Sequence, residues 1–179
     1  GDMGLKPTYV KAAFEYAYDE LKKENFKDKV TLFYNDYDTY FSVDDELALI
    51  SYINEGEDAK ICGGIGMQSH VDIKRPTLEE YGNALKAFIN AGLEVQITEL
   101  DITINFDTDD TDGRTPTYAY KNEKETDVDQ AAFTKDFIKQ IVDIQKNRNK
   151  IISPKGITGI TVWGISDQTS WRGSCKPLF

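Results

Sequence analysis

The stretch Glu94–Thr103, EVQITELDIT, decides the fold, because it reads as a buried strand that carries carboxylates inside an apolar run. Glu99 and Asp101 are two residues apart, which places them on the same face of a strand. Burying a carboxylate without a partner costs several kcal/mol, or forces the group to take up a proton. The pair therefore needs partners from elsewhere in the fold, and it marks this strand as the place to look for chemistry.

Helical and strand-like segments alternate along the whole chain. The spacing of apolar residues predicts helices over residues 8–23, 42–54, 77–91 and 127–147, and strands over 30–36, 60–70, 94–102 and 156–167. Thr8 and Ser42 are the expected N-caps of the first two helices, Thr77 and Glu80 form a capping box, and Gly92 ends the third helix. This αβαβαβαβ order indicates an α/β protein with a parallel sheet and helices packed on it.

Each predicted strand ends in polar or aromatic residues. The four ends are Asn35-Asp36, Gln68-Ser69-His70, Glu99-Leu100-Asp101 and Trp163 to Asp167. In parallel α/β proteins the functional residues collect at the carboxyl ends of the strands. All four strands are expected to point the same way, so their polar and aromatic ends should lie together. The pattern therefore predicts one site at that edge of the sheet.

Composition narrows the class of protein. The chain has 179 residues and a formal net charge of −10, which fits one domain and argues against a nucleic-acid partner, because phosphate binding needs a basic surface. A carbohydrate or a cationic substrate is compatible with this charge. No apolar run is long enough to span a membrane. Cys62 and Cys175 lack zinc-site spacing, and buried thiols are favoured over a disulfide.

Two other segments resemble ligand-binding motifs, one for calcium and one for phosphate, but neither has the residues that its motif requires. FDTDDTDGR, residues 106–114, looks like a calcium loop, yet aligning Gly113 with the loop glycine puts Thr108 at the first ligand position and Ala119 where a glutamate belongs. The glycines of GGIG, residues 63–66, lie inside a strand and form no phosphate-binding motif, so close backbone packing explains them better. We expect no metal and no cofactor.

The four strand ends together resemble a known family. LFYNDYD (32–38), GIGMQSHV (64–71), VQITELDI (95–102) and TVWGISDQTSWR (161–172) are similar to the last four strands of family 10 glycoside hydrolases, the endo-1,4-β-xylanases. The resemblance covers nearly the whole chain. It implies that residues 1–179 are the C-terminal half, strands 5–8, of a TIM (β/α)8 barrel that hydrolyses xylan with retention of anomeric configuration.

The same resemblance shows what this chain does not contain. The proton donor of the family is a glutamate that ends the fourth strand in a VVNE-like motif, and no such strand occurs here. A whole barrel takes about 250 residues. The resemblance therefore implies a nucleophile without its general acid/base, an isolated chain that is inactive, and a secreted, periplasmic or cell-surface location for the full-length protein.

By this resemblance Glu99 is the nucleophile, and it must be ionised when it attacks. His70, the only histidine, is expected to bond Glu99 and to be oriented by Asp101, while Gln68 adds a hydrogen bond to Glu99 or to the sugar. Taken from the residues alone, a lone histidine near a strand end is more often an ordinary surface or core residue, and a Glu-x-Asp pair can simply be exposed.

The substrate contacts implied by the resemblance are aromatic and polar. Trp163 lies at the floor of the sugar site, Trp171 lies above it, and Arg172 contacts sugar hydroxyls; Asn35 and Tyr37 line the leaving-group side. Aromatic faces bind sugars by burying apolar C–H surface, although Trp163 also suits plain core packing. Asp38 replaces the asparagine typical of the family, which leaves its role open.

Two alternatives to a xylanase remain open from the sequence: a noncatalytic or inactive carbohydrate-binding fragment, and a barrel β-glucanase. The expected partner is xylan or a xylo-oligosaccharide. Half a barrel would also leave open sheet edges and an apolar inner face, so we expect self-association or pairing with the other half. The preferred xylan decoration and chain length are not determined by the sequence.

Overall fold

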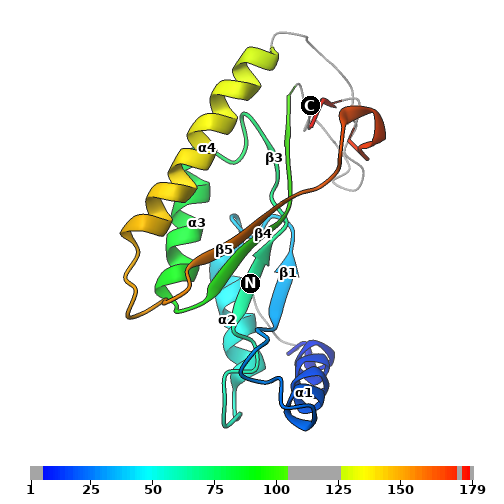
Figure 1. Ribbon diagram of the computed structural model, residues 1–179, viewed down its shortest axis with the longest axis vertical. Helices are drawn as coiled ribbons and strands as arrows, with labels where there is room; N and C mark the ends of the chain where they lie inside the picture. Colours follow the sequence, from blue (N-terminus) through cyan, green and yellow to red (C-terminus); the bar gives the residue numbers. More distant parts are fainter. Residues whose placement is uncertain (1–5, 105–125, 173–174, 178–179) are drawn as a thin grey trace.

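A computed structural model describes residues 6–104, 126–172 and 175–177 of the chain (Figure 1). In chain order its elements are α1 (Thr8–Lys23), β1 (Phe33–Asp36), α2 (Val43–Asn54), β2 (Gly64–Met67), β3 (His70–Asp72), α3 (Leu78–Asn90), β4 (Glu94–Thr103), α4 (Asp127–Asn147), β5 (Ile157–Val162) and a short 3-10 helix, η1 (Asp167–Thr169). The predicted alternation of helices and strands is confirmed. The acidic segment 106–114, which fits a calcium loop poorly, lies outside the described residues.

The strands form one parallel sheet. β1 pairs with β2, β2 and β5 flank β4, and β3 pairs with the far end of β4. β2 pairs with residues 94–97 of β4 and β3 pairs with residues 101–103, so β2 and β3 act as one bent strand. Four strand positions therefore lie side by side, with β1 and β5 at the two edges.

The boundaries differ from the predictions where the backbone turns. The strand predicted over residues 60–70 is two short strands, because Ser69 adopts a left-handed conformation with φ of 65° and interrupts the pairing. Thr8 is the first helical residue rather than the N-cap, a position that Pro7 takes without a side-chain bond. Ser42 occupies the N-cap of α2, but its side chain makes no capping bond.

Other local signals were accurate. Thr77 accepts a hydrogen bond from the backbone N–H of Glu80, and the Glu80 carboxylate accepts one from the backbone N–H of Thr77, which completes the predicted capping box. Gly92 follows α3 with a φ of 76°, a conformation that glycine adopts without strain. α4 begins and ends at the predicted residues.

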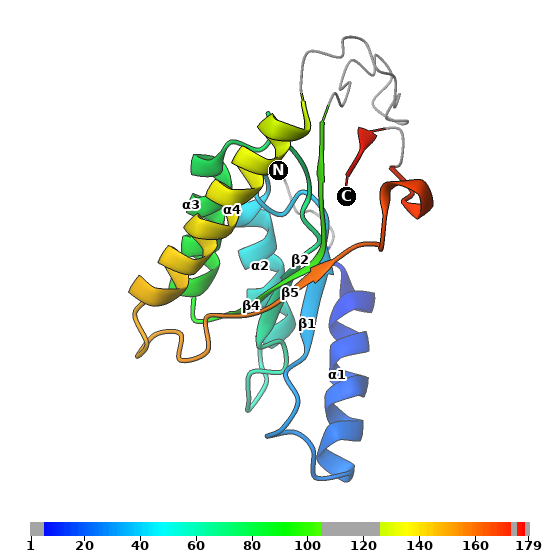
Figure 2. The ribbon, with the colours of Figure 1, turned by 45° about the horizontal axis from the view of Figure 1, so that its top comes forward.

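The core lies between the sheet and one layer of helices. Helices α2, α3 and α4 cover the same face of the sheet, and α1 packs beside α2 (Figures 1 and 2). The largest fully buried side chains of this core come from both layers: Tyr81, Phe88, Phe137, Ile53, Ile65, Met67, Leu85 and Ile97. Burial of this apolar area is the main favourable contribution to folding.

The opposite face of the sheet is polar. Along β4 the buried Val95 and Ile97 alternate with the partly exposed Glu94, Gln96 and Thr98, so one face packs on the helices and the other carries polar groups. An apolar inner face was predicted, and for this part of the sheet the prediction is wrong. The alternation was present in the sequence, but the apolar residues turn toward the helices instead of the barrel interior.

Glu94, the first residue of β4, holds a hydrogen-bond network on this polar face. Its carboxylate accepts hydrogen bonds from Thr31, Thr158 and Lys155, at 3.0, 2.8 and 2.7 Å. Partial burial raises the pKa of Glu94, but the Lys155 ammonium and the two hydroxyls outweigh it and hold that pKa below its usual value. The network ties β4, β5 and the segment before β1 together at the amino-terminal end of the sheet.

A second acidic residue, Glu46, is buried without such support. Its side chain lies on the first turn of α2 and the residue is 7% exposed. The Ser42 hydroxyl donates to one carboxylate oxygen at 3.1 Å. The other oxygen, Oε2, has no hydrogen-bond partner within the described residues. Burial raises the pKa of Glu46 to about 7, and the nearby Asp36 and Asp45 charges add to this effect.

This raised pKa predicts a pH-dependent stability. The folded protein retains the Glu46 proton up to about pH 7, whereas the unfolded chain loses it near pH 4.3. The contribution to the free energy of unfolding is therefore complete below the lower value and is lost as pH rises toward the upper one, by about 4 kcal/mol in total. Glu46→Gln should remove this dependence and stabilise the protein at pH 8 but not at pH 4, as measured by urea denaturation. Parallel stability curves for the two proteins between these pH values would contradict the prediction.

The described residues contain no helix long and apolar enough to cross a membrane.

Cys62 and Cys175 are free, buried thiols, as the sequence favoured. Burial raises the pKa of Cys62 to about 11, which keeps its thiol protonated and unreactive.

Candidate active site

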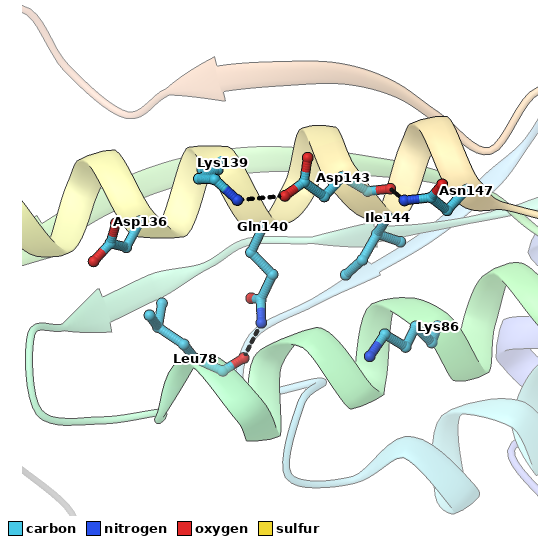
Figure 3. A pocket seen from close by; sticks show the side chains of 8 residues that line it. All are labelled: Leu78, Lys86, Asp136, Lys139, Gln140, Asp143, Ile144 and Asn147. Atoms are coloured by element: carbon cyan, nitrogen blue, oxygen red, sulfur yellow. Dashed lines mark hydrogen bonds and ion pairs between the residues drawn. The ribbon is translucent and has the colours of Figure 1, made fainter.

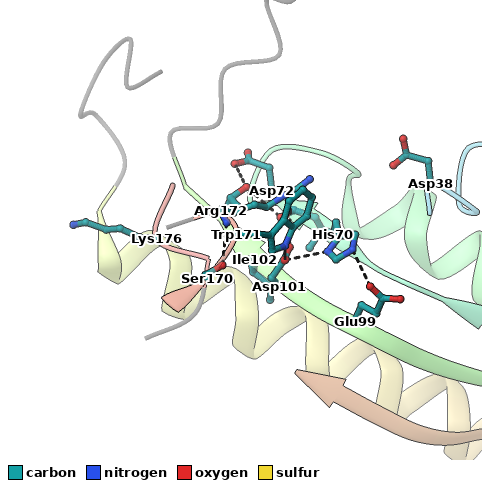
Figure 4. Close-up of polar contacts among 12 residues, drawn as sticks. Asp38, His70, Asp72, Glu99, Asp101, Ile102, Ser170, Trp171, Arg172 and Lys176 are labelled. Atoms are coloured by element: carbon teal, nitrogen blue, oxygen red, sulfur yellow. Dashed lines mark hydrogen bonds and ion pairs between the residues drawn. The ribbon is translucent and has the colours of Figure 1, made fainter. Parts of the chain in front are cut away.

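His70, Glu99 and Asp101 meet just beyond the carboxyl end of β2, where His70 begins β3 and Glu99 and Asp101 lie in the second half of β4 (Figure 4). His70 Nδ1 lies 3.0 Å from Asp101 Oδ2, and His70 Nε2 lies 3.4 Å from Glu99 Oε2. The side chain of Asp101 is 0% exposed, and those of His70 and Glu99 are 11% and 16% exposed. One imidazole therefore bridges the two carboxylates. The prediction that Glu99 and Asp101 share a face and meet His70 is confirmed as geometry.

A β-bulge in β4 turns Glu99 toward this site. Between the paired residues Ile97–Ile160 and Leu100–Val162, β4 advances by three residues while β5 advances by two. The additional residue in β4 shifts the alternation of side chains beyond it. Without the bulge, Glu99 would follow the buried phase of Val95 and Ile97 and would point into the helix layer.

Asn35 connects β1 to two neighbouring residues of the bulge. Its Oδ1 accepts a hydrogen bond from the Thr98 hydroxyl at 2.6 Å, and its Nδ2 donates to Glu99 Oε1 at 3.3 Å. A Cβ atom at Gly66 would lie 2.4 Å from Asn35 Oδ1, so glycine is needed there for Asn35 to reach across the sheet. This confirms the prediction that the strand glycines allow close packing.

His70 is placed by the kink that separates β2 from β3. The left-handed Ser69 turns the chain, and its hydroxyl is held by the Tyr81 hydroxyl at 2.7 Å. The Tyr40 hydroxyl lies 3.3 Å from the backbone oxygen of His70 and donates to it. Neither Tyr40 nor Tyr81 was identified from the sequence, because no local signal marks a residue that acts on the backbone of another strand.

Asp101 has further partners from the segment after β5. Trp171 Nε1 donates to Asp101 Oδ2 at 3.0 Å, and Arg172 Nη1 lies 3.4 Å from Asp101 Oδ1. The Trp171 ring meets the His70 ring edge-on, with centroids 4.9 Å apart, and the Arg172 guanidinium lies 4.6 Å from the centre of the Trp171 ring. Chain segments far apart in sequence thus converge on one buried carboxylate.

The structure shows what Arg172 and Gln68 contact within the protein. Arg172 was expected to contact sugar hydroxyls, but it is 9% exposed and its guanidinium is engaged with Asp101 and Trp171. A buried carboxylate attracts a nearby cation, because the Coulomb attraction between charges is larger where water is excluded. Gln68 was expected to bond Glu99 or the sugar; its backbone carbonyl accepts a hydrogen bond from the Glu99 N–H at 3.0 Å, and a side-chain contact with the sugar stays a prediction.

The remaining predicted residues line the same edge of the sheet. Trp163 directly follows β5 and is 46% exposed, and Trp171 is 53% exposed, so both indoles offer surface to a ligand. Tyr37 follows β1 and is also exposed. Asp36 accepts hydrogen bonds from the Tyr34 hydroxyl and from the backbone N–H of Tyr37.

The hollows on the helix layer are separate from this site. One lies between α3 and α4, where Gln140 reaches across to the Leu78 carbonyl and Lys139 pairs with Asp143 (Figure 3). Another runs along α2 beside Tyr52. Both are lined by surface charges and lie on the helix side of the sheet. Within the described ranges, no group of three or more His, Cys, Asp or Glu side chains could hold a metal ion.

Comparison with known proteins places the chain in a family. The model of "Glycosyl hydrolase family 10" matches residues 2–179. The chain is 42% identical over 178 residues to endo-1,4-beta-xylanase A of Butyrivibrio fibrisolvens, covering 99% of this chain and 36% of that protein. It is 32% identical to endo-1,4-beta-xylanase A of Xylanibacter ruminicola, covering 93% of this chain and 44% of the relative. The chain thus spans less than half the length of these relatives.

Solved structures show the same partial coverage. The CBM22-1-GH10 modules of endo-1,4-beta-D-xylanase 10B from Clostridium thermocellum, complexed with xylohexaose, match with a TM-score of 0.67 and 29% identity, over 96% of this chain and 29% of that one. A GH10 endoxylanase from a sugarcane soil metagenome matches in fold, with a TM-score of 0.70 over 96% of this chain and 48% of that one. The α/β fold class, a parallel sheet that matches about half of a (β/α)8 barrel, is confirmed. The family model, the relatives and the geometry at the strand ends agree, and the chain belongs to glycosyl hydrolase family 10.

Proposed function

We propose that this chain forms strands 5–8 of the catalytic barrel of a retaining endo-1,4-β-xylanase and carries its nucleophile, Glu99. The observation that carries the proposal is the bridge from Asp101 through His70 to Glu99, placed at the carboxyl edge of a parallel sheet. The relatives are named endo-1,4-beta-xylanases, and a solved neighbour is a complex with xylohexaose. A secreted, periplasmic or cell-surface location fits a polymeric substrate and is part of the proposal.

The surroundings of Glu99 suit a nucleophile. Asn35 Nδ2 donates to one carboxylate oxygen and His70 Nε2 lies beside the other, so both oxygens are held in place while the side chain stays partly open to solvent. The polar groups are fixed before substrate binds, which avoids reorganisation during the reaction.

The proposed reaction is a double displacement. The Glu99 carboxylate attacks the anomeric carbon of a xylose unit and forms a glycosyl ester, while an acid protonates the departing glycosidic oxygen. Water, deprotonated by the same acid in its basic form, then attacks the anomeric carbon and releases Glu99. Retaining enzymes place the two carboxyl groups about 5–5.5 Å apart, and the sequence contains no strand that ends in the VVNE-like donor motif.

The test uses a complete barrel, made by joining this chain to the preceding part of the Butyrivibrio fibrisolvens xylanase. We expect this complete barrel to hydrolyse xylan, to release products that keep the β configuration in the first NMR spectra, and to act far more slowly on β-glucans. Faster hydrolysis of a β-glucan would make the protein a β-glucanase. Binding of xylohexaose without any hydrolysis would instead favour a noncatalytic carbohydrate-binding function.

A further inference from the structure

We propose that Arg172 is a positioning residue, which acts through Asp101 and His70 to hold Glu99 in its reactive orientation. This inference rests on the proposed function, because it concerns the same nucleophile. It differs from the sugar-binding role that the sequence suggested for Arg172, and the two roles predict different kinetic effects.

The first observation is that the two carboxylate oxygens of Asp101 have different partners. Its buried carboxylate uses Oδ2 for His70 and Trp171 and Oδ1 for Arg172. Because the two oxygens face different donors, the pair with Arg172 fixes the rotation of the carboxylate plane. Oδ2 then stays directed at the imidazole.

The second observation is charge. Asp101 and Glu99 are two carboxylates that flank one imidazole, and the Asp101 side chain is fully removed from solvent. A buried carboxylate is costly unless its charge is offset. Arg172, itself 9% exposed, supplies a permanent positive charge on the side of Asp101 opposite the imidazole. Arg172 therefore offsets the charge of Asp101, while the His70 imidazole lies between Asp101 and Glu99.

The third observation is the contact between Arg172 and Trp171. The guanidinium lies over the indole ring, and the same indole donates to Asp101 and packs edge-on against His70. A cation over an indole face stabilises the ring orientation. Arg172 thus acts on Asp101 in two ways, directly and through the indole (Figure 4).

The test compares Arg172→Met and Arg172→Lys in the complete barrel. The substrate is an aryl β-xylobioside whose leaving group is chosen so that formation of the glycosyl ester limits kcat, which then reports the attack by Glu99. We expect Arg172→Met to lower kcat by about 10- to 100-fold, because small misplacements of reacting groups have effects of this size. KM should stay within about threefold, because a positioning residue does not bind the ground-state sugar. Arg172→Lys keeps the charge and should restore a substantial part of kcat.

A structural arginine provides the matched control. Arg148 donates to the backbone carbonyls of Gln145, Ser153 and Pro154 at the end of α4, far from the strand ends. Arg148→Met should lower Tm while leaving kcat unchanged. If Arg172→Met fails to fold, the lysine variant still tests the proposal through the rate at which a 2-deoxy-2-fluoro xylobioside traps Glu99, which should be below that of the wild type.

The outcomes separate the two proposals. A wild-type barrel that hydrolyses no xyloside would overturn the proposed function, and this inference with it. An active wild type with unchanged kcat and trapping rate in the Arg172 variants would overturn this inference alone. A large rise in KM with unchanged kcat would also overturn it, because that pattern belongs to a residue that binds the sugar directly.

Discussion

Replacing Glu99 with glutamine in the complete barrel should abolish the hydrolysis of xylan, with kcat reduced by about 10⁴-fold or more, as for the loss of other catalytic nucleophiles. Glutamine has nearly the same shape as glutamate and can still accept from Asn35, so the fold should be retained. The amide cannot form the glycosyl ester, and no second step can follow. The measurements are initial rates on xylan, together with Tm as a check on folding.

Two further variants make this prediction specific. Glu94→Gln alters a carboxylate on the same strand that serves the Lys155 network, and it should lower stability while leaving turnover within a few-fold of the wild type. Glu99→Ala opens space for a small anion, so added azide should attack the anomeric carbon from the vacated face and give a glycosyl azide. Full activity in Glu99→Gln, or loss of activity in Glu94→Gln alone, would refute the nucleophile assignment.

The isolated chain should show no measurable hydrolysis of xylan, whereas joining it to the preceding barrel half should create activity. The nucleophile is present, but protonation of the leaving oxygen needs a second carboxyl group that the sequence does not supply in its strand-end motif. General acid catalysis alone contributes about 10²- to 10⁴-fold, and the sugar site gains its other wall only in the complete barrel. A purified isolated chain as active as the complete barrel would contradict this.

The same preparation tests the association expected of an incomplete sheet. β1 and β5 are edge strands, and Ile160 and Val162 on β5 are 43% and 44% exposed. Open edges favour pairing with another chain, so we expect the isolated chain to self-associate or to bind a separately expressed first half in sedimentation experiments. The polar face around Glu94 weakens the case for association through the sheet face, and a dilute, stable monomer would contradict the expectation.

The sequence by itself determined the elements, their order and the edge at which the site forms. Helical periodicity, the Thr77 capping box and the stop at Gly92 act within a few residues, so they can be read locally. The strand-end motifs likewise indicated His70, Glu99 and Asp101, because parallel strands bring their carboxyl ends to one edge. Even the small size of Gly66 was correctly attributed to close packing.

Only the tertiary structure decided how these side chains face one another. The bulge opposite β5 puts Glu99 on the open face, the left-handed Ser69 directs His70, and Asp101 draws Arg172 away from solvent. Strand register and the pairing of buried charges depend on which distant segments lie side by side, whereas sequence patterns report only the preferences of neighbours along the chain. The sequence therefore indicated which residues form the site. The orientation of their side chains came from contacts between strands and segments far apart in the sequence.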